Sequence, residues 1–247
     1  MKYTFVDTIG TGVGHGQYLR DFSEFEEETP WADPILRIFF RYATVKNYSL
    51  YRTSAFDYLP RFLAAALVIL LSPIFILIAT LIKVMMPGKV FYKQTRVGQN
   101  GKLFQVLKFR TMIENAEDST GHTLSWTGDP RITGLGSFLR KSHLDELPQL
   151  INVVKGEMFF IGPRPERPEF TAIFEETIKG YNDRHRVKPG ITGLAQLACT
   201  YNATASQKLK FDLMYIAMKD SFILNTMIAI YTIKKMIFLK STANLLR

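Results

Sequence analysis

The feature that most constrains this chain is an uncharged apolar stretch, Phe62 to Ile82, in a sequence of 247 residues. It is about long enough to cross a bilayer as a helix, and soluble domains normally interrupt such runs with polar faces. Ser72 and Pro73 stand at its middle. A proline there removes one backbone hydrogen bond and clashes with the preceding turn, so the sequence predicts a bend.

A bent apolar segment has two topologies, because it either crosses the bilayer or enters and returns to the same side. Basic residues flank it on both sides. Those before it are Arg41, Lys46, Arg52 and Arg61, and those after it are Lys83, Lys89, Lys93, Arg96, Lys102, Lys108 and Arg110. Basic flanks at both ends fit two cytoplasmic ends better than one crossing. We therefore predict a re-entrant helix over residues 61–86.

The charge balance indicates an anionic partner. The formal net charge is +9, which points to nucleic acid, acidic lipid or a phosphorylated substrate. Cys199 is the only cysteine, so disulfides within the chain and cysteine-built zinc sites are excluded. Residues 1–60 give less information. They hold a glycine-rich stretch and a segment from Asp33 that predicts a helix, either on a membrane surface or packed in a soluble domain.

An acidic pair, Asp145 and Glu146, precedes apolar residues at helical spacing. These are Leu147, Leu150, Ile151 and Val154. Pro148 fits only near the start of a helix, so we expect the pair in the first turn of an amphipathic helix, with Asp145, Gln149 and Asn152 on its polar face. Helix N-termini favour ionised carboxylates and attract phosphate. A carboxylate, a phosphate and a divalent cation could share this corner, or the acids could be capping charges only.

Two prolines enclose Arg164 in the segment Gly162-Pro163-Arg164-Pro165. The apolar run before it, residues 158–161, predicts a short buried strand or an extended piece. Prolines fix the backbone on both sides of one guanidinium, which suits bidentate binding of phosphate.

A hairpin is predicted within residues 89–112, because two β-rich runs flank Asn100-Gly101. Strand side chains alternate, so Lys108 and Arg110 share one face of the second strand. This face could bind phosphate, or the basic hairpin could lie against anionic headgroups.

Three further segments carry polar or basic signals. Asp129 and Arg131 lie in a predicted turn, and Thr133 can cap the helix that leads to Arg140. A basic cluster follows later: Arg184, His185, Arg186 and Lys188. It could bind a nucleotide or face lipid. Residues 222–239 are apolar with lysines that could reach headgroups, which predicts an interfacial helix.

The motifs, taken in order, resemble the bacterial sugar transferase family, the monotopic polyprenyl-phosphate hexose-1-phosphate transferases. They are the apolar segment with Ser72-Pro73, PGKVFYKQTRVGQNGKLFQVLKFRTM, DPRITGLGSFLRKSHLDELPQLINVVKGEM, GPRPE and KPGITGLAQ. The likeness covers about residues 60 to 235. No single motif would suffice, but the ordered set is highly specific.

The resemblance implies transfer of a sugar 1-phosphate from a UDP-sugar to undecaprenyl phosphate, with release of UMP. This would be the initiating step in the synthesis of an exopolysaccharide, capsule, O-antigen or glycoprotein glycan. Asp145 would attack the sugar-proximal phosphate and form a covalent phosphosugar intermediate, with Glu146 as its dyad partner. Mg²⁺ would bridge Asp145 and the diphosphate. The positions assigned to substrate phosphate are Arg140, Arg164, Lys108 and Arg110, and further matched motif positions are Asp129, Arg131, Glu157, Ser72 and Pro73.

The fold class expected from the resemblance and the patterns is α+β. We expect a helix-rich monotopic membrane protein with a re-entrant helix hairpin, one short β-hairpin and interfacial amphipathic helices. The expected organisation is an N-terminal extension 1–60, the re-entrant helix 61–86, the catalytic domain 87–205 and C-terminal interfacial helices 206–247. The expected place is the cytoplasmic face of a bacterial inner membrane, among its lipids, without nucleic acid and with a homodimer left open.

Two positions depart from the family pattern. Ala64 stands where the family usually has an acidic residue after the basic residue that opens the membrane helix, and His143 occupies a serine-like position before the dyad. A competing hypothesis is a non-catalytic, membrane-anchored basic binding protein. A third, a metal-dependent glycosyltransferase, lacks support because the sequence has no Asp-x-Asp pair.

Overall fold

The computed structural model describes residues 55–116, 126, 128–199 and 203–242. These residues form two compact units, which we describe separately. The dyad unit holds residues 55–95 and the described part of 105–158, and the PRP unit holds 96–104 and the described part of 159–242. These two units are defined by contacts between residues, whereas the domain boundaries expected from the sequence were assigned by function. Those domain boundaries therefore stay predictions. The helix expected from Asp33 lies outside the described residues.

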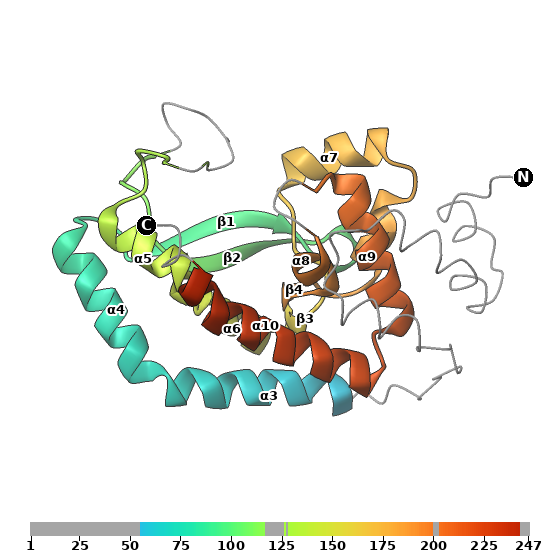
Figure 1. Cartoon of the computed structure of the whole chain (residues 1–247), viewed down its shortest axis with the longest axis horizontal. Helices are drawn as coiled ribbons and strands as arrows, with labels where there is room; N and C mark the ends of the chain where they lie inside the picture. Colours follow the sequence, from blue (N-terminus) through green and yellow to red (C-terminus); the bar gives the residue numbers. More distant parts are fainter. Residues whose placement is uncertain (1–54, 117–125, 127, 200–202, 243–247) are drawn as a thin grey trace, which may run out of the picture. The chain divides into compact units, whose positions relative to one another are not determined.

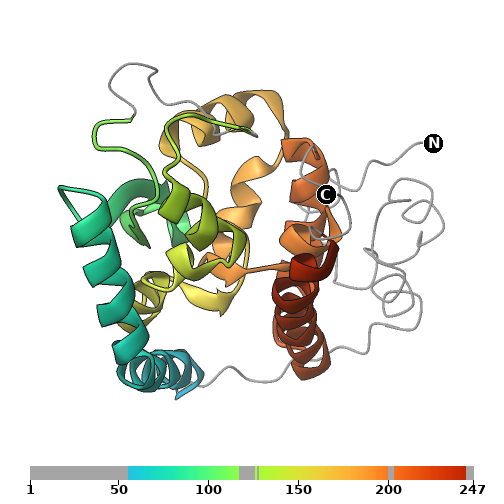
Figure 2. The same cartoon turned by 60° about the vertical axis from the view of Figure 1, so that its left-hand side comes forward.

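The apolar stretch forms two helices that meet at a bend, α3 (Ala55–Leu70) and α4 (Ser72–Met85). The break is 62° (Figures 1 and 2), and Pro73 lies in the first turn of α4, where its missing N–H is unpaired in any helix. The predicted bend is confirmed. Across the described ranges no single helix is long and apolar enough to cross a membrane, whereas the two bent halves together reach that length and composition.

The predicted hairpin is also confirmed. Strands β1 (Phe91–Val97) and β2 (Leu103–Phe109) pair across a 3₁₀ turn, η2 (Gln99–Gly101). Asn100 and Gly101 both have positive φ, 55° and 74°. This is the combination that tight two-residue hairpin turns require, and Asn-Gly adopts it at low cost.

The core of the dyad unit joins α4, the base of the hairpin and α5 (Gly134–Lys141). Phe109 is almost fully buried at its centre, with ring centroids 5.6 Å from Phe75 and 5.4 Å from Phe91. Thr133 caps α5 as predicted, because its side-chain oxygen accepts a hydrogen bond from the Gly136 N–H at 2.9 Å. After α5 come the 3₁₀ turn η3 (Leu144–Glu146) and α6 (Gln149–Lys155).

The PRP unit combines a parallel strand pair with helices. Its elements are β3 (Phe159–Ile161), α7 (Pro168–Thr177), η4 (Tyr181–Arg186), β4 (Gly190–Thr192), α8 (Leu194–Ala198), α9 (Ala205–Met218) and α10 (Phe222–Thr242). Strand β3 was expected, although its residues are half-buried rather than buried. Its parallel partner β4 was not predicted. The described chain is thus α+β and helix-rich, with a short β-hairpin.

The core of the PRP unit lies among α8, α9 and α10. Leu194, Phe211, Leu224 and Ile228 are almost fully buried there. Helix α10 leaves other apolar side chains exposed: Phe222, Ile223, Ile230 and Ile233. Its expected place at a membrane interface stays a prediction.

Close backbone approaches fix glycine at two places. A Cβ on Gly136 would overlap the carbonyl oxygen of Thr111 and lie 2.6 Å from its carbonyl carbon. Where β3 meets β4, a Cβ on Gly162 would lie 2.6 Å from the Lys188 oxygen, and a Cβ on Gly190 2.6 Å from the carbonyl carbon of Ile161. Such distances leave no room for any side chain.

The contact at Gly136 gives the first prediction. Gly136→Ala should lower the free energy of unfolding by about 1–3 kcal/mol, because the added methyl group forces α5 away from the Thr111 backbone. Gly134→Ala is the matched control, since the same change in the same helix meets open space. That control should be neutral or stabilising by up to about 1 kcal/mol. Thermal unfolding in detergent measures both, and equal midpoints would contradict the close approach.

Candidate active site

The acidic pair lies in a 3₁₀ turn, η3, and not in the first turn of an amphipathic helix as the sequence predicted. His143 has a left-handed backbone, φ 56°, which turns the chain after α5. Pro148 is the N-cap residue of α6, so that helix begins only at Gln149. The prediction that Pro148 lies near the start of a helix is confirmed. Asp145 and Glu146 precede α6, because Pro148 caps this helix from outside its first turn.

The polar residues expected to share one face of this helix are buried. Asp145 is 8% exposed, Gln149 3% and Asn152 0%, whereas the apolar Val154 is 37% exposed. Leu150 is buried too, so the polar residues and part of the apolar set both lie against the protein. Buried polar groups need hydrogen-bond partners. For Asn152, these partners are backbone groups of strand β2.

The side chain of Asn152 pairs with strand β2. Its Oδ1 accepts a hydrogen bond from the Leu107 N–H at 3.0 Å, and its Nδ2 donates to the Gln105 carbonyl at 2.7 Å. The same Nδ2 donates to Oε2 of Glu157 at 2.6 Å. The amide thus replaces a neighbouring strand and joins α6 to β2. Sequence reasoning missed Asn152 as a site-building residue, and the only signal was a polar residue among apolar ones.

This junction brings Lys108 of β2 to Glu146 of η3. The Lys108 Nζ lies 2.7 Å from the Glu146 Oε1, and both side chains are about four-fifths buried. Two residues that the sequence separates by 38 positions therefore form one ion pair. Lys108 therefore contacts the acidic pair directly. Its expected role in binding substrate phosphate stays a prediction.

The pKa of Asp145 is raised above its usual range, mainly because burial disfavours the charged carboxylate. Lys108 and Arg140 act in the opposite direction, since nearby cations stabilise the ionised form. Arg140, in the last turn of α5, is oriented by a hydrogen bond from its Nε to the Thr111 Oγ1 at 2.8 Å. The structure thus gathers Asp145, Glu146, Lys108 and Arg140 into one charged site.

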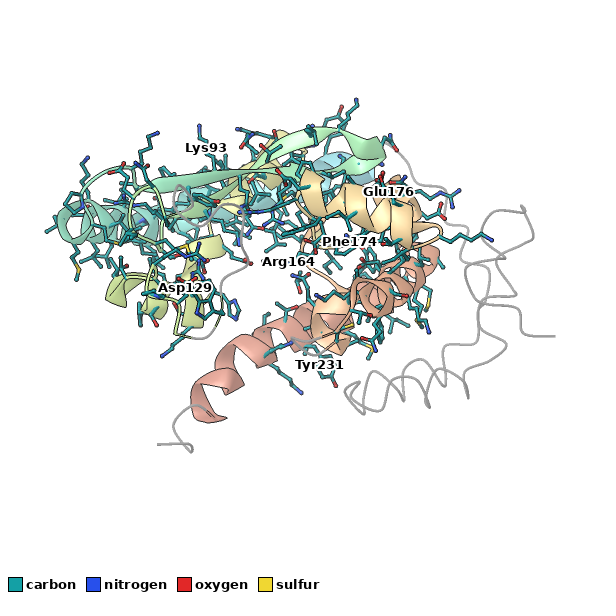
Figure 3. All side chains as sticks on the ribbon, turned by 90° about the horizontal axis from the view of Figure 1, so that it is seen from above. Lys93, Asp129, Arg164, Phe174, Glu176 and Tyr231 are labelled. Atoms are coloured by element: carbon teal, nitrogen blue, oxygen red, sulfur yellow. The ribbon has the colours of Figure 1, made fainter. Side chains whose placement is uncertain are left out.

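Asp129 and Arg131 form a second, buried pair before α5, with Asp129 labelled in Figure 3. Arg131 donates from Nε to Oδ1 at 2.9 Å and from Nη2 to Oδ2 at 2.7 Å. These hydrogen bonds lower the pKa of the Asp129 carboxyl. The guanidinium also lies 5.0 Å from the Trp126 ring centroid. The pair fixes the segment that leads into Thr133 and α5.

Arg110 is the residue that follows strand β2, whose last residue is Phe109, and its backbone N–H donates to the Val90 carbonyl at 2.9 Å. The expectation that it shares a strand face with Lys108 stays a prediction. Its buried guanidinium donates to the carbonyl oxygens of Met86 and of Pro87, the latter at 3.0 Å. Arg110 therefore secures the end of α4, and its assignment to substrate phosphate stays a prediction.

Arg164 belongs to the PRP unit, and its role at the substrate phosphate stays a prediction. Ser72 and Pro73 lie at the bend between α3 and α4. The predicted basic cluster is not one open surface. Arg184 and His185 are buried, and the cavity that they line has a volume of only about 10 Å³.

The chain matches the family model described as bacterial sugar transferase over residues 51–239. It is 43% identical over 161 residues to the UDP-glucose:undecaprenyl-phosphate glucose-1-phosphate transferase of Escherichia coli strain K12, covering 62% of this chain and 34% of that one. It is 44% identical over 158 residues to the UDP-N-acetylgalactosamine-undecaprenyl-phosphate N-acetylgalactosaminephosphotransferase of Aeromonas hydrophila, covering 62% and 37%.

A relative of similar length is the exopolysaccharide production protein PSS of Rhizobium leguminosarum bv. phaseoli. It is 39% identical over 163 residues, covering 63% of this chain and 82% of that one. The matched region thus spans about a third of the length of the Escherichia and Aeromonas relatives and most of the Rhizobium relative.

Asn152 gives the prediction for this site. Asn152→Leu should lower the free energy of unfolding by about 2–5 kcal/mol, because the part-buried Leu107 N–H and Gln105 carbonyl lose their hydrogen-bond partner, at about 1–3 kcal/mol each. Val154→Leu, on the exposed side of the same helix, is the control and should be nearly neutral. Urea unfolding followed by circular dichroism measures the difference. An Asn152→Leu variant as stable as the parent would contradict the conclusion that the Asn152 side chain holds α6 against β2.

Proposed function

Because the chain belongs to the bacterial sugar transferase family, we propose that it transfers a sugar 1-phosphate from a UDP-sugar to undecaprenyl phosphate and releases UMP. The Escherichia and Aeromonas relatives are named for transfers from UDP-glucose and UDP-N-acetylgalactosamine to undecaprenyl phosphate, and the Rhizobium relative for exopolysaccharide production. The proposed role is the initiating step of polysaccharide synthesis. The observation that carries it is the buried Asp145 beside Glu146 and under the influence of Lys108 and Arg140.

The first step is attack by a carboxylate oxygen of Asp145 on the sugar-proximal phosphorus of the donor. A bond forms between that oxygen and phosphorus, while the bond from this phosphorus to the bridging oxygen breaks. UMP leaves with the bonding electrons, and the sugar phosphate stays on Asp145. A covalent intermediate divides one difficult transfer into two displacements.

In the second step, a phosphate oxygen of undecaprenyl phosphate attacks the same phosphorus. The bond to Asp145 breaks, the carboxylate is released, and the product is undecaprenyl-diphosphate-sugar. Neither step creates or consumes a proton overall when the phosphates are ionised. Asp145 must therefore be ionised at the start of each cycle.

The neighbouring charges suit this chemistry. Arg140 lies where its charge stabilises an ionised Asp145, and a guanidinium can also bind the donor's phosphates. The ion pair with Lys108 fixes Glu146 beside the nucleophile. Arg164 is proposed as a further phosphate ligand from the PRP unit. Fixed cations stabilise the charge that gathers on the phosphate oxygens during transfer.

The donor set fits Mg²⁺ as the proposed cofactor. Within the described part of the chain, no group of three or more His, Cys, Asp or Glu side chains is placed to hold a metal. Mg²⁺ is usually bound through one or two carboxylates together with substrate phosphates, and Asp145 can supply such a carboxylate. Asp145 would hold the ion together with the substrate's phosphates, and the ion would supply neutralisation of charge on the phosphate oxygens.

The lipid substrate requires a membrane, and α3 with α4 offers the surface for one. Phe62, Ile69, Leu70 and Val84 are each more than 70% exposed. We propose that the bent pair enters the inner membrane and returns to the cytoplasmic side, with α10 at the interface. A large exposed apolar surface of this kind marks membrane or protein contact.

The non-catalytic binding protein and the glycosyltransferase remain as alternatives, and the nucleotide product separates all three. Purified protein in detergent is incubated with undecaprenyl phosphate, Mg²⁺ and each of several UDP-sugars. UMP together with a lipid-linked phosphosugar supports the proposed function. UDP would indicate glycosyl transfer, and the absence of any nucleotide product would support the binding protein.

Asp145→Asn tests the nucleophile. The variant should fold but lose lipid loading by more than about a thousandfold, as removal of a covalent nucleophile does, and mass spectrometry should find the phosphosugar adduct only on the parent. Asp220→Asn, the same change at an exposed ion pair with Lys219, is the control and should keep parental activity. A folded Asp145→Asn variant with the parental rate would refute the mechanism.

Lys108→Met tests the charge balance at Asp145. Removal of this cation should raise the pKa of Asp145 further, since Lys108 lowers it. The ionised nucleophile then appears only at higher pH, so the acid limb of the pH–rate profile should move upward. The control is Lys93→Met, on the exposed side of β1 (Figure 3), which should leave the profile in place. An unchanged acid limb in Lys108→Met would contradict the claim that Lys108 lowers the pKa of Asp145.

A further inference from the structure

The backbone of residues 162–166, which we name the PRP segment, is hydrogen-bonded at every residue within the PRP unit. The Gly162 N–H donates to a carbonyl, and the next four carbonyls each accept one hydrogen bond. In order from Gly162 to Glu166, the partners are the Thr192 oxygen, the Gly190 N–H, the Arg184 guanidinium, the Arg96 guanidinium and the Val97 N–H.

Arg164 is the one cationic residue of this segment. Pro163 and Pro165 are buried, whereas Arg164 between them is half-buried (Figure 3). The prolines fix their own φ angles and restrict the residue before each of them. The segment therefore presents the Arg164 side chain from an immobile backbone.

The bond to the Arg164 carbonyl comes from a buried guanidinium with every nitrogen occupied. Arg184 donates from Nε to Oδ2 of Asp212 at 3.0 Å, and from Nη1 to the Tyr181 hydroxyl at 2.6 Å. Its Nη2 lies 2.7 Å from the same Asp212 oxygen and donates to the Arg164 carbonyl at 2.8 Å. Arg184 is 5% exposed and Asp212 2%.

A buried ion pair of this kind is weak evidence for a role in stability, because apolar residues of similar volume are often equally stable or better. What Arg184 and Asp212 provide is geometry. The planar guanidinium reaches three different partners at once, and a lysine, with its single ammonium group, cannot reproduce that arrangement. The carbonyl that it fixes belongs to Arg164 itself.

We propose that Arg184, held by Asp212 and Tyr181, is a positioning residue that fixes the Arg164 backbone so that the Arg164 side chain meets the diphosphate of the nucleotide-sugar donor. This inference rests on the proposed function, and it assigns no substrate contact to Arg184. It requires that Arg184 act through Arg164 alone. A residue that is only structural would affect the enzyme whether or not Arg164 is present.

The test is Arg184→Lys in two backgrounds, the parent and Arg164→Ala. In the parent, kcat/KM for the UDP-sugar should fall about 10- to 100-fold, the loss that misplacement of a binding group by about 1 Å produces. In Arg164→Ala, whose residual activity is followed with excess enzyme, the same change should have less than about a twofold effect. Arg186→Lys is the matched control, since that side chain is 62% exposed, and it should be silent in both.

Hydrogen exchange gives a readout that does not depend on catalysis. Arg184→Lys should increase deuterium uptake in a peptide covering residues 159–167, because the segment loses one restraint, while Arg186→Lys should not. Circular dichroism verifies that Arg184→Lys folds.

The outcomes separate this inference from the proposed function. With an active parent, unchanged uptake, equal fold-losses in both backgrounds, or failure of Arg184→Lys to fold would each overturn the positioning role. A parent that forms no lipid-linked phosphosugar with any UDP-sugar would instead overturn the proposed function.

Discussion

The arrangement of the dyad unit depends on the hydrogen bonds of one amide. Asn152 joins α6 to β2 by bonding two backbone groups of the strand, and this places Lys108 within 2.7 Å of Glu146. Without it, only the Lys108–Glu146 ion pair and the packing of Leu144 and Leu147 against the core would hold the turn that carries Asp145 to the hairpin. An amide is neutral, so the junction holds the two elements together without adding charge beside the nucleophile.

Asp145 stands between two opposing influences. Burial raises its pKa, and the cationic neighbours lower it. In the proposed reaction this balance is useful, because a poorly solvated carboxylate is more nucleophilic, while the cations keep it ionised. The Asp129–Arg131 pair differs, since its charges neutralise one another through two hydrogen bonds. Both sites use buried carboxylates, but only Asp145 lacks a dedicated cation of its own among the interactions described above.

Local signals in the sequence predicted the local structure. Pro73 predicted the bend, Asn100-Gly101 predicted the hairpin turn and Thr133 predicted the helix cap. Each prediction succeeded because the residue determines the backbone conformation of its immediate neighbours. The sequence could not place the strand partners of Asn152 or the partners of Arg110, since those bonds join residues 23 to 47 positions apart. Motifs in the sequence pointed to the candidate site residues. The 3₁₀ turn that holds Asp145 and the hydrogen bonds of Arg184 became known only from the structure.

The contact between Gly162 and Gly190 has an evolutionary consequence. Both positions already carry the smallest residue, and each would collide with the opposite chain if it gained a methyl group. A mutation at either site therefore has no compensating replacement at the other, in contrast to ordinary core positions, where a larger residue can be balanced by a smaller neighbour. Descendants of this chain can vary the residues around the parallel pair of β3 and β4, while the close approach of Gly162 to Gly190 accepts no larger residue on either side.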